Sequence, residues 1–362
     1  MSSMTECVHY RRMPQKINNI KNKKRGVFIK RILYFLIIMA GLILLFNPEE
    51  ASADTVEFKA DGLNYTIDKK TMTASVVSPV SEKMTELVVP DSVTYEKKAV
   101  PVTEIAEYAF FESKLKTAVL GSNVVKIGEG AFAFSTKLKK VTIPAATEDI
   151  GDAAFAGCAK LKSTGIVKKS GVKWIGDGAF ADTAITSFTV PANTEYIGMA
   201  AFSGCASLKK IVIYSKCRNI GDGAFSGCNA LKKVTVSKKN KSYAFSGGCL
   251  YSADKTVLVS ALSAAGELEI PEGVLEIAPY AFEENTKVTS VLLPESLIKI
   301  GECAFLDAEG LEKISFGSGL ELIGENAFYG CTGLKTIAVL PGTEETEGYP
   351  FDDNDGVVII QG

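Results

Sequence analysis

The apolar residues of the chain recur in a block with the pattern Ile-Gly-x-x-Ala-Phe, which appears nine times with small changes. Successive isoleucines of this block are 22, 23, 25, 22, 23, 57, 23 and 23 residues apart. A fixed period near 23 is typical of repeat proteins, whose coils stack because no single coil can bury its own apolar face. The pattern therefore predicts a repeat solenoid. The isoleucines are Ile105, Ile127, Ile150, Ile175, Ile197, Ile220, Ile277, Ile300 and Ile323.

Each block is followed by an apolar residue, two variable residues and an apolar-x-apolar ending, as in Leu138, Val141 and Ile143. The alternation at the ending predicts one short parallel strand per coil of about 23 residues, with one face buried. Proline directly after the ending, as at Pro144 and Pro191, ends the strand because proline cannot donate to a ladder.

The phenylalanine block is short and glycine-rich, as in IGDGAFSGC at 220–228. It predicts a turn followed by one helical or 3₁₀ turn. An acid two residues past the isoleucine, such as Asp152 or Asp177, is expected to cap the positive end of that turn. The phenylalanines are expected to stack into a buried column across the coils.

The repeats divide the chain into four parts. Residues 1–53 form a signal peptide with a long basic leader, and residues 54–103 form a β-rich N-terminal cap over the first coil. Nine repeat units occupy residues 104–341, interrupted by an irregular, hairpin-bearing coil near 237–270. Residues 342–362 are expected to close the other end of the array as a C-terminal cap.

The sequence resembles the BspA-like leucine-rich repeats of bacterial surface proteins over roughly residues 61–362. The resemblance rests on the IGDGAFSGC-type block followed by LKKVTV or LKKIVI, on VPDSVTYEKKAVPVTEIAEYAF at 89–110, and on the CLYSADKTVLV segment. It implies a leucine-rich-repeat array in a secreted or surface-attached protein. Some members of the family bind host matrix proteins or other cells.

The N-terminal segment has the order of a secretory signal. A 15-residue apolar run, Ile32 to Phe46, follows Lys30-Arg31, and Ala51-Ser52-Ala53 supplies a small-x-small cleavage site. The run is shorter than the roughly 20 apolar residues of a membrane span. We expect export and cleavage after Ala53, with an uncleaved membrane anchor as the alternative.

Charge and composition argue against several activities. The formal net charge is −2, but residues 54–362 hold 31 Lys and Arg against 39 Asp and Glu, a net charge of −8 that argues against general nucleic-acid binding. The only histidine is His9 in the leader, so the exported form would lack a Ser-His-Asp triad, a Cys-His nucleophile pair and His-ligated zinc. No P-loop, dinucleotide fingerprint or calcium-loop spacing occurs, and we expect no cofactor and no metal.

Four of the eight cysteines share one repeat position. Cys158, Cys205, Cys228 and Cys331 each lie three residues after the repeat phenylalanine, where other units hold Ser, Thr, Asn or Ala. This slot is interpreted as a small buried site in which cysteine packs as a small hydrophobe, and the thiols are expected to stay unpaired. Cys217, Cys249 and Cys303 lie outside the slot, and the sequence pattern assigns them no role.

Two surface features are candidates for partner binding. Lys140, Lys210, Lys233 and Lys313 occupy outward positions of the predicted strands, and a positive stripe there would attract an acidic protein surface or a sulfated glycan. The alternative is a solvated lysine edge that keeps the array soluble.

Trp174 and Tyr196 precede the repeat isoleucine in adjacent coils. They are expected to form an exposed aromatic pair that could bind a sugar or a proline-rich peptide. Ordinary packing over a longer coil is the alternative.

These observations favour a secreted or cell-surface protein that mediates recognition or adhesion and is not an enzyme. An extracellular protein or glycan is the expected partner, with no nucleic acid. A structural scaffold module of the envelope is an alternative, as is a β-helix-like enzyme acting on polysaccharides, whose coils have a similar length. Such an enzyme would need one coil face with unique polar residues, whereas the strand faces here repeat the same residue types.

Overall fold

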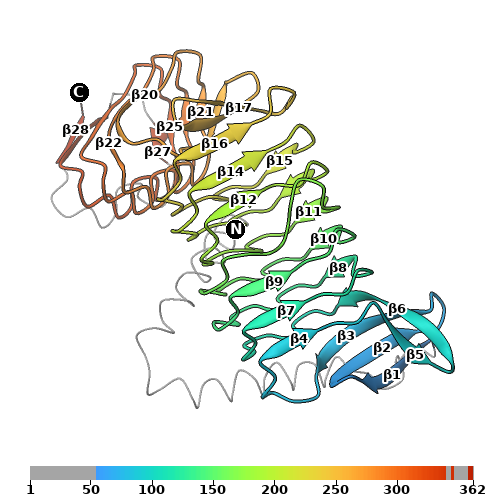
Figure 1. Ribbon diagram of the computed structural model, residues 1–362. Helices are drawn as coiled ribbons and strands as arrows, with labels where there is room; N and C mark the ends of the chain where they lie inside the picture. Colours follow the sequence, from blue (N-terminus) through green and yellow to red (C-terminus); the bar gives the residue numbers. More distant parts are fainter. Residues whose placement is uncertain (1–53, 340–343, 346–357, 362) are drawn as a thin grey trace, which may run out of the picture. The chain divides into compact units, whose positions relative to one another are not determined.

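A computed structural model describes residues 54–339, 344–345 and 358–361. These residues form strands and turns in coils of about 23 residues, and no helix occurs among them, so the expected solenoid is confirmed (Figure 1). Within these ranges no helix is long and apolar enough to cross a membrane. The predicted leader and most of the predicted C-terminal cap at 342–362 lie outside the described residues.

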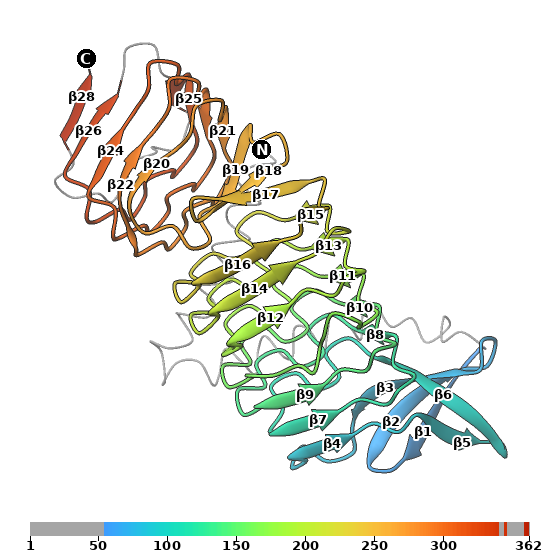
Figure 2. The same cartoon turned by 45° about the horizontal axis from the view of Figure 1, so that its top comes forward.

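The coils carry a second parallel strand in addition to the expected one (Figures 1 and 2). The coil between Ile150 and Ile175 is an exception, because its expected strand is reduced to an isolated bridge between Ser163 and Lys140. The second strand is only two residues long and ends on the repeat isoleucine, with Ile150 paired to Ile127 and to Ile175. In the first half of the array these short strands are β8 (Lys126–Ile127), β10 (Asp149–Ile150), β11 (Trp174–Ile175), β13 (Tyr196–Ile197) and β15 (Asn219–Ile220). The expected strands are β7 (Thr117–Val119), β9 (Lys140–Thr142), β12 (Ser187–Thr189), β14 (Lys210–Ile213) and β16 (Lys233–Val236).

The N-terminal region extends both ladders, and its strands are longer than the repeat strands in the ladder of the two-residue strands. β6 pairs in parallel with β8 on one side and with β3 on the other, and β4 pairs in parallel with β7. β5 and β6 form an antiparallel pair. The strands are β1 (Thr55–Ala60), β2 (Leu63–Asp68), β3 (Thr73–Pro79), β4 (Glu86–Val88), β5 (Ser92–Tyr95) and β6 (Lys98–Ile105).

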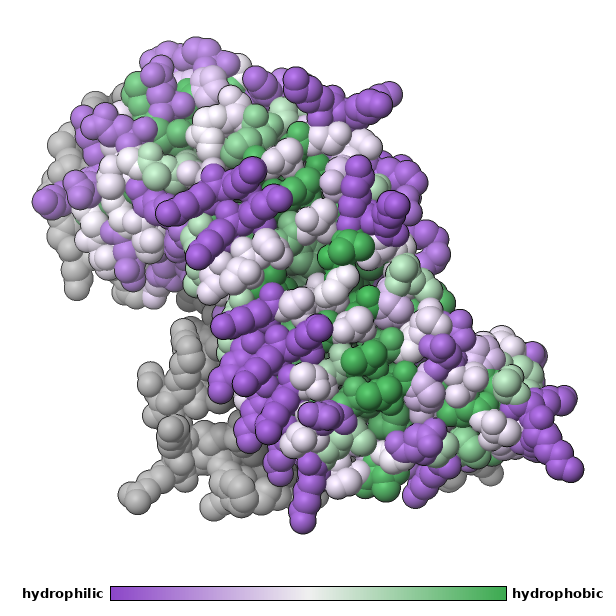
Figure 3. Space-filling view, viewed as in Figure 1, coloured by the Kyte–Doolittle hydropathy of each residue, from purple (hydrophilic) through white to green (hydrophobic). Residues whose placement is uncertain are grey.

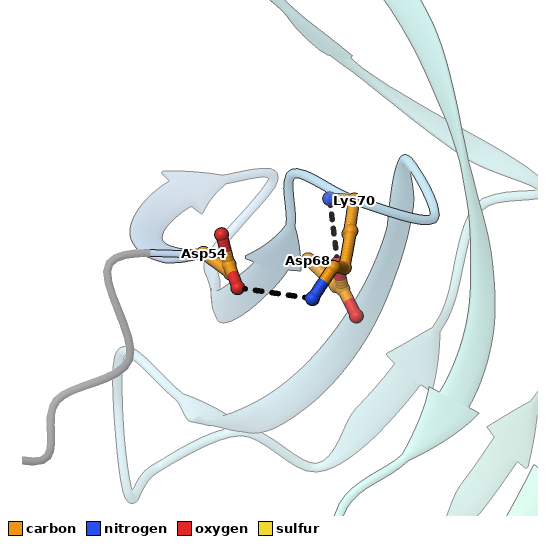
Figure 4. A network of polar contacts seen from close by, with 3 residues as sticks. All are labelled: Asp54, Asp68 and Lys70. Carbon is orange, nitrogen blue, oxygen red and sulfur yellow. Dashed lines mark hydrogen bonds and ion pairs between the residues drawn. The ribbon is translucent and has the colours of Figure 1, made fainter.

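Two short segments at the start of the described chain, within residues 54–56 and 68–70, form a small unit of their own. The Lys70 Nζ atom lies 3.4 Å from Asp54 Oδ2, and the Lys70 amide donates to Asp68 Oδ1 at 2.7 Å (Figure 4). The Lys69 amide also donates to the carbonyl of Asp54 at 2.7 Å. These contacts hold Asp54, the first residue after the predicted cleavage site.

The interruption near 237–270 contains two antiparallel strand pairs, β17 with β18 and β18 with β19. β19 then pairs in parallel with β21, and regular coils resume. The strands of the interruption are β17 (Tyr243–Ser246), β18 (Cys249–Ser252), β19 (Val257–Ser260) and β20 (Gly266–Glu269). The strands that follow it are β21 (Glu276–Ile277), β22 (Val288–Leu292), β23 (Lys299–Ile300), β24 (Lys313–Ser315), β25 (Leu322–Ile323), β26 (Thr336–Val339), β27 (Glu344–Glu345) and β28 (Val358–Gln361).

The repeat phenylalanines form the expected buried column. Neighbouring rings from Phe110 to Phe225 stack with centroids 5.1–5.6 Å apart, and a second run from Phe282 to Phe328 stacks at 4.5–5.0 Å. Each ring is at most 4% exposed. Truncation of one such ring to alanine typically costs about 3–5 kcal/mol, so this column is a main source of cohesion between coils.

The expectation of a helical or 3₁₀ turn in the phenylalanine block is wrong. The third residue after each repeat isoleucine has a left-handed backbone, with φ of 54° at Tyr108, 55° at Gly130 and 50° at Ala153. A left-handed residue reverses the chain and prevents a helix from forming. The acids of this block also differ from the expected caps. Asp152 Oδ1 and Asp177 Oδ1 accept the amides of Asp177 and Met199 in the following coils, both at 2.8 Å.

The shared cysteine slot is a hydrogen-bond donor position. The thiols of Cys158, Cys205, Cys228 and Cys331 each donate to a phenylalanine carbonyl in the preceding coil at 3.0–3.2 Å. The Ser135 hydroxyl makes the same bond at 2.8 Å. The interpretation as a purely hydrophobic slot therefore missed its polar role, although the serine, threonine and asparagine found there are also donors.

All seven cysteines among the described residues are buried, and none of them is disulfide-bonded. Burial raises the pKa of Cys158 and Cys331 to about 12 and that of Cys205 to about 11. Cys217 and Cys249, which the sequence left without a role, also have a pKa raised by burial to about 12. Thiols with such pKa values are almost entirely protonated at neutral pH and are poor nucleophiles.

Candidate partner-binding surface

Eight lysines line one edge of the coils that carry the expected strands, and we call them the lysine ladder. All eight are exposed: Lys116, Lys139, Lys140, Lys162, Lys209, Lys210, Lys232 and Lys233. Figure 3 shows hydrophilic side chains gathered along one edge of the coils that carry β7 and β9. The ladder therefore follows a repeated element, beside the strands of two separate three-stranded sheets, rather than scattered loops.

Backbone hydrogen bonds between coils align these lysines. The amide of Lys139 donates to the carbonyl of Lys116 at 2.9 Å, and the amide of Lys162 donates to that of Lys139 at 3.0 Å. In the upper part the amide of Lys232 donates to the carbonyl of Lys209 at 3.1 Å. The coil between the two groups carries Thr186 and Ser187 at these positions. The ladder thus has a lower cluster of four lysines and an upper cluster of four.

The ladder lysines make no ion pair with any other described residue. The edge formed by the two-residue strands is different, because ion pairs there join adjacent coils. They are Lys126 with Glu104 at 3.0 Å, Lys173 with Glu148 at 2.7 Å, Arg218 with Glu195, and Lys299 with Glu276 at 2.8 Å. The hydrogen bond to Glu104 raises the pKa of Lys126. The fold therefore neutralises charge along one edge and leaves it open along the other.

The structure brings together only some of the predicted lysines. Lys210 and Lys233 are direct partners in the β12-β14-β16 sheet, and Lys140 pairs with Thr117 and bridges to Ser163 in the sheet of β4, β7 and β9. Lys313 belongs to a third sheet, where it pairs with Ser290 and follows Glu312. All four are exposed, but Lys313 is not part of the lysine ladder.

Charge is also sorted along the array, which the sequence analysis missed. Residues 111–242 contain 20 Lys and Arg against 9 Asp and Glu, a net charge of +11. Residues 243–362 contain 5 Lys and Arg against 20 Asp and Glu, a net charge of −15. Residues 54–110 contain 6 Lys and Arg against 10 Asp and Glu. Counting by repeat rather than over the whole chain would have revealed this split. The lysine ladder lies entirely in the positive segment.

Trp174 and Tyr196 stack face to face, with ring centroids 3.8 Å apart and planes 12° from parallel. They are register partners in β11 and β13, and Trp174 is 46% exposed. The Tyr196 hydroxyl lies 3.4 Å from Asp177 Oδ1. Because each ring covers one face of the other, much of the aromatic surface that a sugar would need is already occupied. The pair therefore makes a weaker candidate for a sugar platform than its exposure suggests.

An aromatic group that the sequence analysis did not single out lies on the turns of the first coils. Tyr108 and Phe111 are 52% and 43% exposed, and their rings meet edge to face at 6.2 Å. Phe111 also meets Phe134 at 5.7 Å. A Cβ atom on Gly130 would lie 2.5 Å from the Tyr108 ring, so the glycine makes room for the ring.

The described residues contain no cluster of three or more His, Cys, Asp or Glu suited to a metal ion.

Two stacked parallel ladders, a buried phenylalanine column and a coil of about 23 residues define a leucine-rich-repeat solenoid. The chain belongs to the family of the BspA type leucine rich repeat region, which matches residues 83–173, 173–253 and 261–359. No curated protein matches the sequence.

Several solved structures share the fold. A leucine rich cell surface protein from Faecalibacterium prausnitzii A2-165 is 24% identical, with a TM-score of 0.63 over 86% of this chain and 96% of its own. The pneumococcal vaccine antigen PcpA is 24% identical, with a TM-score of 0.62 over 80% of this chain and 77% of its own. A leucine-rich repeat protein from Eubacterium ventriosum is 26% identical, with a TM-score of 0.59 over 78% of this chain and 71% of its own.

Proposed function

We propose that the chain is an exported recognition module that binds an extracellular macromolecule through the lysine ladder and catalyses no reaction. The observation that carries this proposal is the alignment of eight exposed lysines without an ionic partner among the described residues. Aligned charges of one sign raise the local potential and attract an oppositely charged surface. An acidic protein or an anionic glycan has the required chemistry.

Export and surface location are supported by two observations. The apolar run Ile32 to Phe46 and the site Ala51-Ser52-Ala53 have the order of a cleavable signal. One protein with the same fold is described as a leucine rich cell surface protein. Recognition also suits the fold, because stacked coils present a long, regular surface to a partner.

The test is affinity capture with the full chain, produced with its leader in a bacterial host that exports it. The ladder variant carries Lys140→Glu, Lys210→Glu and Lys233→Glu. A matched control carries Lys169→Glu, Lys238→Glu and Lys239→Glu, which change the net charge equally at exposed positions outside the ladder.

We expect a saturable extracellular partner whose capture is lost in the ladder variant and kept in the control. Absence of any saturable partner would favour an envelope scaffold, and turnover of a polysaccharide panel would favour the enzyme. Either outcome contradicts the proposal.

A further inference from the structure

We infer that the lysine ladder binds a linear sulfated polysaccharide that lies across the coils, parallel to the stacking direction. This inference rests on the proposed function and names its partner. The lysines of the ladder occupy five of six successive coils, one or two in each, and paired parallel strands lie about 4.8 Å apart. The coils of Lys162 and Thr186 are not paired as strands, so the five steps from Lys116 to Lys232 span at least about 24 Å. A row of charges that long and narrow matches an extended polymer better than the convex surface of a globular acidic protein.

The chemistry of the ladder favours sulfate groups on a sugar chain. Every cation in it is lysine, whose ammonium is a point charge with three donors and imposes no planar geometry on the anion. No aromatic residue belongs to the ladder, so it lacks the stacking platforms with which proteins hold single-stranded nucleic acid. A tetrahedral oxyanion on a flexible chain fits such donors.

Hydroxyl groups share the register column with three of the lysines. Thr117 is the register partner of Lys140, Ser163 bridges to Lys140 on the other side, and Ser187 is the partner of Lys210. These three side chains are exposed. Sugar hydroxyls can bond to them between sulfate contacts, whereas a bare polyphosphate offers no such groups. The mixed column therefore favours a sulfated glycan.

The charge distribution fixes where the polymer ends. The ladder belongs to the segment 111–242 with a net charge of +11, and the following segment, 243–362, carries −15. A polyanion is attracted by the first and repelled by the second. The footprint should thus stop near Lys233, and Lys313 should contribute nothing. Three more exposed lysines, Lys114, Lys137 and Lys160, occupy equivalent positions in the coils of the lower cluster.

The experiment measures binding of heparin fragments of graded length to the exported full chain by isothermal titration calorimetry. Fragments that reach only one cluster should bind weakly. Fragments long enough to span both clusters should bind about 10²- to 10⁴-fold more tightly, because the second contact becomes intramolecular. Replacement of the upper cluster by Lys209→Gln, Lys210→Gln, Lys232→Gln and Lys233→Gln should remove this gain but keep the affinity for short fragments. The control Lys169→Gln, Lys238→Gln, Lys239→Gln and Lys313→Gln should bind as the parent does.

Three results would overturn the inference. The first is an affinity that does not depend on fragment length or on the upper cluster. The second is equal binding of single-stranded DNA or polyphosphate of the same length, which would show that the ladder recognises only the charge of the polymer. The third is preferential binding of an acidic globular protein through the ladder, which would leave the proposed function intact and remove only the glycan. Thermal melting of each variant verifies that these exposed substitutions leave the fold intact.

Discussion

The cysteine slot gives a sharp prediction about what holds neighbouring coils together. The Cys158 thiol is fully buried and donates to the carbonyl of Phe132 at 3.1 Å. In the preceding coil the Ser135 hydroxyl, also fully buried, donates to the carbonyl of Phe110 at 2.8 Å. If the slot requires a donor, Cys158→Ser should be tolerated and Cys158→Ala should not.

The magnitudes follow from the contacts. The alanine variant loses one buried heavy atom, about 1 kcal/mol by transfer, and a hydrogen bond with a net value of about 0.5–1.5 kcal/mol. The Phe132 carbonyl also accepts the amide of Ser135 at 3.1 Å, so it keeps one partner and the cost stays near the lower end. We expect a loss of about 1–2 kcal/mol for Cys158→Ala and less than about 1 kcal/mol for Cys158→Ser.

The assay is urea unfolding of the exported chain with reductant at neutral pH, followed by circular dichroism. Both variants and the parent are compared under identical conditions, since repeat arrays need not unfold in two states. The order of the two variants in stability decides whether the slot requires a hydrogen-bond donor. A serine variant less stable than the alanine variant would show that the slot is only hydrophobic, because a buried hydroxyl without a partner costs about 1–3 kcal/mol.

Three further predictions concern other parts of the chain. Burial is the main cause that raises the pKa of Asp149, so the charged carboxylate destabilises the fold above that pKa. Asp149→Asn should therefore raise the melting temperature at pH 7, and the difference in melting temperature between variant and parent should shrink as the pH falls through the carboxyl's pKa. A difference that stays constant with pH would argue against a role of the charge. Trp174 is the only tryptophan and is 46% exposed, so acrylamide should quench its fluorescence in the folded protein, and Tyr196→Ala should increase that quenching; a shielded tryptophan would contradict the exposed pair. Cleavage after Ala53 should give an exported protein whose N-terminal sequencing begins at Asp54, and retention of the full chain in the membrane would refute it.

The sequence was sufficient to predict the solenoid, because the period of the isoleucines and the phenylalanine column both follow from stacking identical coils. The two-residue strands such as β10 could not be predicted, because two residues carry no alternation that a periodicity argument can detect. The turn geometry was missed because Ala153 and Ala200 take a left-handed backbone that alanine rarely adopts alone. In that conformation their amides donate to the carbonyls of Asp177 and Asp222 in the next coil, at 2.7 and 3.0 Å, a contact that the sequence does not reveal.

The candidate site was predicted in part. The outward lysines Lys140, Lys210 and Lys233 are exposed as expected, and their repeat position was enough to place them on one edge. The sequence could not show that the ladder lacks ionic partners among the described residues while Lys126 and Lys299 have them, because lysines occur on both edges. That difference depends on which acids the adjacent coil places opposite.

The most direct test of the lysine ladder is to measure the reactivity of individual lysines. The exported protein is acetylated briefly with and without a saturating long heparin fragment, and each lysine is quantified by mass spectrometry. Protection of Lys139, Lys140, Lys209, Lys210, Lys232 and Lys233, with unchanged reactivity at Lys169, Lys238 and Lys313, is the predicted result. Uniform protection of all exposed lysines, or protection centred outside the ladder, would contradict it.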